Sequence, residues 1–227
     1  MKRIYRWLEV RHIGLLRLLT SFKAHLPFSG NKFRIKGYNN TLNLNSADLT
    51  GTHFDVVGNN INIQIGDGSK LKGLLIYIRG DNHAVYIGSK CRFRRGGEIW
   101  MENTNGVVRI GDKTTVEEVQ FASTEGGKII VGNDCMLAND IDIRTGDSHS
   151  IISNDSGKRI NIAQDVSLKD HVWVGAHVRI LKGVTVGEGS IIATSSVVSR
   201  SVPASVVSGG VPNKTIKNNV RWDRERI

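Results

Sequence analysis

The second half of the chain repeats every six residues, from Ile162 onward. The first positions of the repeat are all aliphatic: Ile162, Leu168, Val174, Ile180, Val186, Ile192 and Val198. Four residues after each stands a Val or a Ser: Val166, Val172, Val178, Val184, Ser190, Ser196 and Val202. A period of six fits neither an α-helix nor an alternating strand. It is typical of a chain coiled into a triangular prism, in which six residues form one face and turn one corner.

A looser form of the repeat extends upstream, from about Asn40 to Gly146. Pairs of an aliphatic residue and Gly recur here with spacings of 22, 23 and 21 residues: Ile65-Gly66, Ile87-Gly88, Ile110-Gly111 and Val131-Gly132. Because three sixes need only 18, each of these coils carries three to five extra residues. The extra residues fall in 79–84, 103–106 and 124–127, which hold Gly-Asp, Asn-Gly and Gly-Gly turn signals. We expect them to stack along one edge of the prism.

The repeat predicts an all-β fold, a parallel β-helix with one continuous core. The expected organisation of the 227 residues is an N-terminal segment (1–39), a β-helix domain (40–211) with a loop at 149–161, and a basic C-terminal tail (212–227). Cys91 and Cys135 occupy small inward-facing positions and are interpreted as core residues. Without a disulfide framework or a signal peptide, a cytoplasmic location is expected.

The first 25 residues are strongly basic and predict an amphipathic helix over 2–25. Such a helix could cover the open first coil of the prism, or it could lie on an anionic membrane surface, peripheral to the inner membrane. The net charge of +10 calls for a partner. No nucleic-acid partner is expected, because the chain carries no recognised nucleic-acid motif and its aromatic residues do not interleave with basic ones.

The strict repeat is interrupted once. Val131, Leu137 and Ile143 stand six apart, but position 149 is His and the pattern resumes only at Ile162. Thirteen residues where six were due predict a loop with seven extra residues, and long loops often carry function. By phase, Ser148 should lie one coil below Trp173. His149 and Trp173 are therefore expected at one corner of the prism, on adjacent coils.

The segment 170–203 reads DHVWVGAHVRILKGVTVGEGSIIATSSVVSRSVP, and GGVPNK follows at 209–214. This sequence resembles the hexapeptide acyltransferases of the left-handed β-helix class. It is most similar to galactoside/maltose-type O-acetyltransferases and to the O-acetyltransferases of bacterial capsules and lipopolysaccharides. The match covers residues 129–217 clearly. The resemblance implies a left-handed coil, a homotrimer, and acetyl-CoA bound between neighbouring prisms.

The resemblance also implies roles for individual residues. His149 matches the catalytic base and Trp173 the Trp that borders the site. Positions matching acetyl-CoA contacts are Gly175, Ala176, Thr194, Ser199, Arg200 and Lys214. Asp147 either orients His149 or forms a turn, and Glu117 either faces the acceptor from a neighbouring subunit or lies on a solvated face.

This pattern favours transfer of an acetyl group from acetyl-CoA to a sugar hydroxyl of a bacterial surface polysaccharide, with no metal required. A neutral His can take the proton of the attacking hydroxyl, and backbone N–H groups, with the Trp173 indole, can stabilise the oxyanion. The alternatives are a free-sugar or xenobiotic O-acetyltransferase, a three-His zinc site like that of the β-helical carbonic anhydrases (His149, His171, His177), and a non-catalytic scaffold. The sequence does not identify the acceptor sugar.

Overall fold

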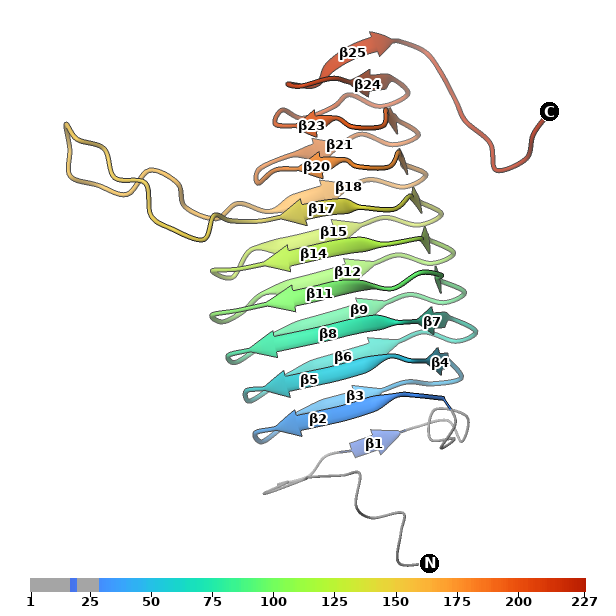
Figure 1. Cartoon of the computed structure of the whole chain (residues 1–227), viewed down its shortest axis with the longest axis vertical. Coiled ribbons are helices and arrows are strands. Elements are labelled where there is room, and N and C mark those ends of the chain that lie inside the picture. Colours follow the sequence, from blue (N-terminus) through green and yellow to red (C-terminus); the bar gives the residue numbers. More distant parts are fainter. Residues whose placement is uncertain (1–16, 20–28) are drawn as a thin grey trace, which may run out of the picture.

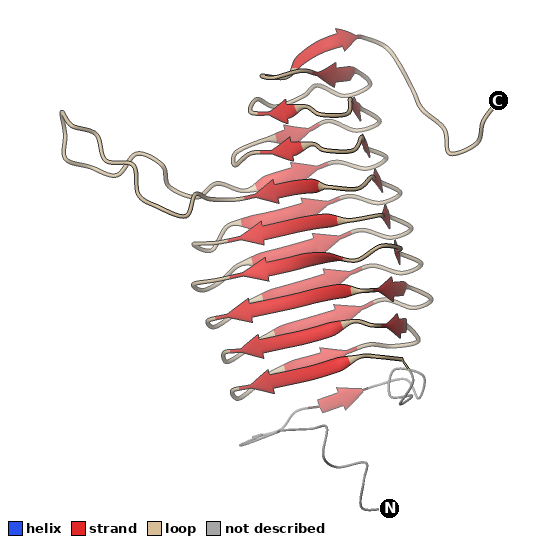
Figure 2. Cartoon of the chain, viewed as in Figure 1, coloured by secondary structure: helices blue, strands red, loops and turns tan. Residues whose placement is uncertain are grey.

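The computed structural model describes residues 17–19 and 29–227, and these form a prism with three sheets as its faces (Figure 1). The described residues contain strands, turns and loops but no helix (Figure 2). Every strand pairs in parallel with the strand one coil away, except for one antiparallel pair at the C-terminal end. The predicted all-β parallel β-helix is confirmed.

The chain visits the three sheets in a fixed order, A, then C, then B. Sheet A contains β1 (Arg17–Leu19), β3 (Thr41–Asn43), β6 (Asn62–Ile65), β9 (Ala84–Ile87), β12 (Val107–Ile110), β15 (Lys128–Val131), β18 (Val166–Leu168) and β21 (Thr185–Val186). Sheet C contains β4 (Asp48–Thr50), β7 (Lys70–Lys72), β10 (Arg92–Phe93), β13 (Thr115–Val116), β16 (Met136–Leu137), β19 (Trp173–Val174), β22 (Ile191–Ile192), β24 (Val207–Gly209) and β25 (Lys214–Lys217). Sheet B contains β2 (Lys32–Lys36), β5 (His53–Val57), β8 (Leu74–Arg79), β11 (Gly97–Met101), β14 (Val119–Ser123), β17 (Ile141–Arg144), β20 (Arg179–Ile180) and β23 (Val197–Val198). The corners that join consecutive sheets are called the AC, CB and BA corners.

The inward positions of the repeat form one continuous core. Val131, Leu137 and Ile143 supply one coil and are at most 1% exposed. The small Ser positions are also buried, and their hydroxyls donate to backbone carbonyls, as Ser190 Oγ does to Pro203 at 2.6 Å. Cys91 and Cys135 are free and fully buried, and burial raises the pKa of each thiol to about 11. Their interpretation as core residues is confirmed.

Strand registers confirm the two spacings predicted for the repeat. In sheet A, Ile63 pairs with Val85 and Val85 with Val108, 22 and 23 residues apart. In the upper coils Leu168 pairs with Val186, 18 residues on. The extra residues of the lower coils lie at the BA corner, as in 80–83 between β8 and β9. They stack there, and one ladder joins Asn39, Asn60 and Asn82 through side-chain amides at 3.3 and 3.0 Å.

A long arm (residues 146–164) leaves the prism at the same corner, between β17 and β18 (Figure 1). Ile129 of β15 pairs with Val166, 37 residues later, so this insertion is larger than the predicted loop 149–161. The arm closes at its base, where the Gln164 N–H donates to the Thr145 carbonyl at 2.8 Å. Ile162 is 63% exposed, so placing it in the core was wrong. The chain is still in the arm there, and the core resumes at Val166.

The two ends of the chain were expected to be a helix and a basic tail. The helix expected over 2–25 lies outside the described residues, apart from Arg17–Leu19, which form a strand paired with β3 instead of a helix. At the other end, β25 runs antiparallel to β24, and the tail then folds back along the prism. Among the described residues, no helix is long and apolar enough to cross a membrane.

Candidate active site

His149 lies at the base of the arm and its side chain is exposed. The residue that fixes this part of the backbone is Asn161, which is only 6% exposed. The Asn161 amide donates to the carbonyl of His149 and to the carboxylate of Asp147, both at 2.8 Å, and its Oδ1 accepts from the Ile151 N–H at 2.7 Å. Sequence reasoning did not single out Asn161. Its position at the end of the predicted loop was the only available signal.

Asp147 fastens the arm to the coil above. Its carboxylate forms an ion pair with Lys182, whose ammonium group also donates to the Asn161 carbonyl at 3.1 Å. The hydrogen bond from Lys182, together with the one from Asn161, lowers the pKa of Asp147 below its ordinary value. The carboxylate thus holds Lys182 and Asn161, and no hydrogen bond joins it to the His149 imidazole among the described residues. Of the two roles considered for Asp147, a structural one is what the contacts support.

A second ion pair fastens the arm to the coil below. Arg159 donates to Glu125 of the BA corner at 2.8 Å and to Asn161 Oδ1 at 3.1 Å. The arm is therefore tied at its base in both directions along the prism axis. The arm exposes four isoleucines, whose exposed fractions are between 52% and 64%: Ile151, Ile152, Ile160 and Ile162. An apolar surface of this kind is typical of a segment that packs against another molecule.

Trp173 begins β19 at the AC corner and is 38% exposed. It pairs with Met136 below and Ile191 above. The expectation that His149 and Trp173 share a corner is therefore wrong, because His149 belongs to the BA corner. The phase argument assumed seven extra residues, whereas the register across the arm is 37 residues and aligns Trp173 with Met136.

The C-terminal tail packs beside Trp173. Trp222 is only 7% exposed and stacks on His171, with ring centroids 4.0 Å apart, while its indole N–H donates to the His171 carbonyl at 2.8 Å. The Trp222 and Trp173 rings lie 6.0 Å apart at 53°. Arg224 then reaches Asp134 and Thr115, at 2.8 and 3.1 Å. This tail contact was not foreseen, because nothing in the repeat extends past residue 211.

The residues expected to bind acetyl-CoA fall into two clusters. Gly175, Ala176 and Thr194 meet at the CB corner, where the Ser195 N–H donates to the Ala176 carbonyl at 2.9 Å. A Cβ on Gly175 would lie 2.8 Å from the Thr194 nitrogen, so this close stacking of coils requires Gly. The other cluster, Ser199, Arg200 and Lys214, surrounds the buried Asn213. Its Oδ1 accepts from the N–H groups of Ser199 and Arg200 at 3.0 and 3.3 Å.

The structure separates the three histidines of the zinc alternative from one another, and Glu117 lies on the outer surface. Glu117 forms an ion pair with Arg94 at 3.3 Å on the outside of the prism. His171 pairs with Asp134 at the AC corner and His177 with Asp140 at the CB corner, at 2.8 and 2.7 Å. With His149 at the BA corner, the three histidines occupy three different corners. They form no common ligand set within the described part of one chain.

Known proteins that resemble this chain in sequence are hexapeptide-repeat transferases. Residues 165–200 match the family described as Bacterial transferase hexapeptide (six repeats). The chain is 37% identical to the polysialic acid O-acetyltransferase of Neisseria meningitidis over 149 residues, which cover 65% of this chain and 68% of that protein. It is 38% identical to the polysialic acid O-acetyltransferase of Escherichia coli O1:K1 / APEC, but there the match spans only 38% of the relative's length.

Two solved structures resemble most of the chain. The polysialic acid O-acetyltransferase OatWY aligns with a TM-score of 0.82 and 33% identity, over 86% of this chain and 92% of that one. The polySia-specific acetyltransferase NeuO aligns with a TM-score of 0.74 and 35% identity, over 86% of both chains. These likenesses extend well beyond the six-residue repeat, into the irregular lower coils.

Proposed function

Because the chain belongs to the hexapeptide-repeat acyltransferases, we propose that it is an O-acetyltransferase that moves the acetyl group of acetyl-CoA to a sugar hydroxyl of a bacterial surface polysaccharide. The observation that carries this proposal is the arm. The arm is the one long insertion between β3 and β23, and it presents an exposed His on a fixed backbone. The solved relatives that align with 86% of the chain are polysialic acid O-acetyltransferases.

In the proposed reaction His149 is the general base. Its neutral imidazole accepts the proton of the acceptor hydroxyl while that oxygen forms a bond to the thioester carbonyl carbon. The resulting oxyanion is stabilised by N–H donors, for which the Trp173 indole is a candidate. Collapse breaks the carbon–sulfur bond, and the proton held by His149 goes to the departing thiolate. The products are the acetylated sugar and CoA.

The proposed donor site follows the upper coils. Gly175, Ala176 and Thr194 form a tightly stacked corner, exposed at Thr194, that suits the pantetheine arm of acetyl-CoA. Arg200 and Lys214 are exposed cations at the C-terminal end, where the nucleotide phosphates would lie. These assignments rest on the family motif. What supports them is that hydrogen bonds between separate segments hold each cluster: Ser195 N–H to the Ala176 carbonyl in the first, and Ser199 and Arg200 N–H to Asn213 Oδ1 in the second.

The separation of His149 and Trp173 supports a homotrimer. They lie at two different corners of one triangular prism, so one chain does not bring them together. A three-fold ring places one corner of each prism against a different corner of the next, and closed rings are built from such unlike contacts. The four exposed isoleucines of the arm would be buried at this contact, gaining roughly 25 cal/mol per Å² of apolar surface. We propose that each site combines the arm of one subunit with Trp173 of its neighbour.

We also propose that the enzyme acts in the cytoplasm, peripheral to the inner membrane, where a polysaccharide is assembled. The strongly basic first 25 residues motivate the membrane association.

The test is a screen of the purified full chain with acetyl-CoA, in which released CoA is measured with a thiol reagent. Acceptors are polysialic acid, neutral oligosaccharides, free sugars and a xenobiotic alcohol. We expect release that depends on a polysaccharide. Release with free galactosides or maltose alone would move the assignment to the free-sugar type. No release with any acceptor would contradict the proposal.

A further inference from the structure

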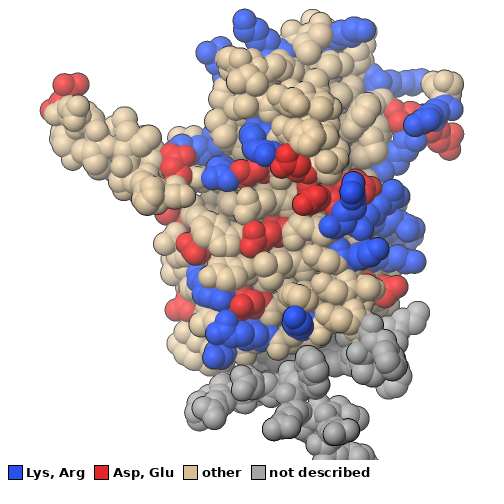
Figure 3. Space-filling view, in the orientation of Figure 1, with Lys and Arg blue, Asp and Glu red and all other residues tan. Residues whose placement is uncertain are grey.

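Sheet C carries a ladder of unpaired cations on its lower coils. Outward-facing positions on the neighbouring strands β7 and β10 are Lys70, Lys72 and Arg92, and all three side chains are exposed. Within the described part of the chain, none of them makes an ion pair with an acidic group. Arg94 lies beside them, paired with Glu117. Figure 3 shows Lys and Arg gathered along the side of the molecule where β4 and β7 are labelled in Figure 1.

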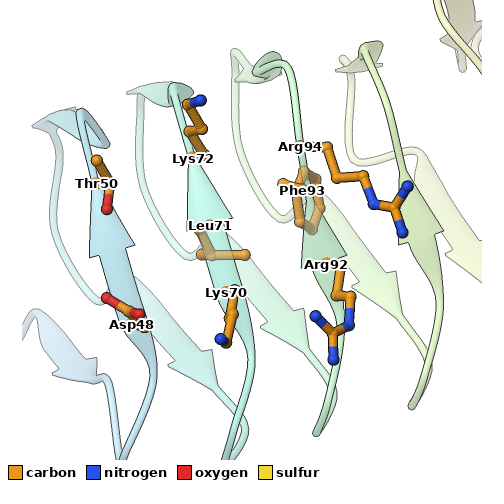
Figure 4. Close-up of a pocket in the computed structure, with 8 residues that line it drawn as sticks. All are labelled: Asp48, Thr50, Lys70, Leu71, Lys72, Arg92, Phe93 and Arg94. Atoms are coloured by element: carbon orange, nitrogen blue, oxygen red, sulfur yellow. The ribbon is translucent and has the colours of Figure 1, made fainter.

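These side chains surround a shallow hollow of about 270 Å³ on the strand face (Figure 4). Its lining also includes Asp48 and Thr50 of β4, together with Leu71 and Phe93, whose side chains are buried in the core. Asp48 lies one rung below Lys70 in the sheet register but is not ion-paired with it. The hollow therefore presents a net positive charge to the solvent.

Without a ligand, the neighbouring positive charges of the ladder lower the stability of the folded sheet. Lys70 and Arg92 are direct neighbours in the parallel register, and like charges on directly paired residues destabilise a sheet. On sheet B, by contrast, the exposed Arg34 is paired with Asp55 of the next coil at 2.8 Å. A ladder left without acidic partners is consistent with an anionic ligand that supplies them.

The ladder also points at the candidate active site. One column of outward positions runs Asp48, Lys70, Arg92, Thr115, Met136, Trp173 through successive registers of sheet C. Three rungs separate Arg92 from Trp173, or about 14 Å at the usual strand spacing. The cations assigned to acetyl-CoA, Arg200 and Lys214, lie on the opposite side of Trp173 along the prism axis. The lower ladder is therefore separate from the donor site.

We propose that Lys70, Lys72 and Arg92 form a binding track for an acidic polysaccharide acceptor, which holds negatively charged sugars of the polymer below the reacting one. The inference rests on the proposed function for its direction, because it takes Trp173 as the reaction centre. It assigns to that site a substrate class, a polyanionic glycan several sugars long. Neutral polymers and single sugars would leave the track empty.

The test measures binding directly, without acetyl-CoA, by calorimetry with short oligosialic acid and with a neutral maltooligosaccharide of equal length. The variant is Lys70→Gln/Arg92→Gln. Its matched control is Lys32→Gln/Lys36→Gln, which removes the same charge from exposed positions of β2 on sheet B. We expect the track variant to bind oligosialic acid about five- to tenfold more weakly, the combined scale of two exposed ion pairs. Its affinity should also depend less on salt, while the control behaves as wild type.

Several outcomes would overturn the track: no binding of oligosialic acid by the wild type, equal affinities of wild type and track variant, or equal losses in track variant and control. Binding through these residues to phosphatidylglycerol vesicles but not to oligosialic acid would make the ladder a membrane contact instead. These results are independent of catalysis. If the screen shows no CoA release with any acceptor while the track variant still loses affinity, the proposed reaction fails and the binding site stands.

Discussion

The upper and lower coils build the same prism from different lengths of chain. Above the arm, registers advance by 18 residues and the strands of sheet B are two residues long, as in β20 and β23. Below it, registers advance by 21 to 23 and β8 reaches six residues. The inward positions stay aligned through both regions. The core therefore fixes the three faces, while added length is taken up around the BA corner.

The difference in regularity coincides with a difference in surface. The upper coils are stacked so closely that Gly175 admits no side chain, and they carry the positions assigned to acetyl-CoA. The lower coils carry longer strands, a stack of turns at the BA corner and the cation ladder of sheet C. The arm and Trp173 lie at the boundary. We infer that the strictly repeating upper coils bind the donor, acetyl-CoA, and that the looser lower coils bind the acceptor polysaccharide.

The largest effect is expected for the arm, where the two regions meet. Replacing His149 by Ala should lower kcat about 100-fold or more, the usual scale for loss of a general base, with little change in the KM for acetyl-CoA. Steady-state CoA release measures it. Ser150→Ala, the next residue on the exposed base of the arm, is the control and should stay near wild type. Near wild-type turnover of the His149→Ala variant would remove His149 from the mechanism.

The second prediction compares the space around two glycines, Gly187 in the stacked coils of the prism and Gly157 at the tip of the arm. A Cβ on Gly187 would lie 2.3 Å from the Ala204 nitrogen, whereas a Cβ on Gly157 would meet nothing within 4 Å. Gly187→Ala should therefore lower the free energy of unfolding by about 1–3 kcal/mol, through overpacking against backbone. Gly157→Ala strains only a local left-handed turn and should leave the global transition unchanged. Urea unfolding of both variants tests this, and equal destabilisation would show that the arm is part of the cooperative core.

The smallest effect is expected for Asp147, which fastens the base of the arm to Lys182 and Asn161. Since hydrogen bonds from Lys182 and Asn161 lower the pKa of Asp147, the contact stabilises the folded arm above the carboxyl's ordinary pKa of 3.8 and is lost as pH falls through the lowered value. Asp147→Asn should speed hydrogen exchange of the Ile151 amide a few-fold at neutral pH. The difference from wild type should shrink as the pH falls below 3.8 and through the lowered pKa of Asp147. Asp155→Asn at the tip of the arm is the control. A pH-independent difference would show that Asp147 acts without its charge.

Much of the fold could be predicted from sequence, because the repeat reports directly which residues face the core. Leu168 and Val174 were placed correctly for that reason, as were the turns at the BA corner. Ile162 was misplaced, because an aliphatic residue in phase is indistinguishable from a core residue when the loop before it has unknown length. The same uncertainty put His149 and Trp173 at one corner.

The six-residue repeat could not predict the contacts made by the arm and the C-terminal tail, because these segments do not follow the repeat. The Asn161 side chain organises the arm through four hydrogen bonds, and Trp222 returns 51 residues along the chain to His171. Neither depends on periodicity. The cation ladder was visible only as overall charge, since its alignment with Trp173 requires the register of sheet C across the arm.

The central claim, that each site combines the arm of one subunit with Trp173 of the next, is tested most directly by mixing two weakened variants. His149→Ala and Trp173→Ala chains are co-expressed, and mixed trimers are purified by two different tags. Around a ring of three subunits, every mixed trimer would contain one interface with both residues intact, so the purified mixed trimers should regain roughly a third of wild-type acetyl transfer. Mixed trimers no more active than the separate variants would contradict the account, as would a protein that is active as a monomer.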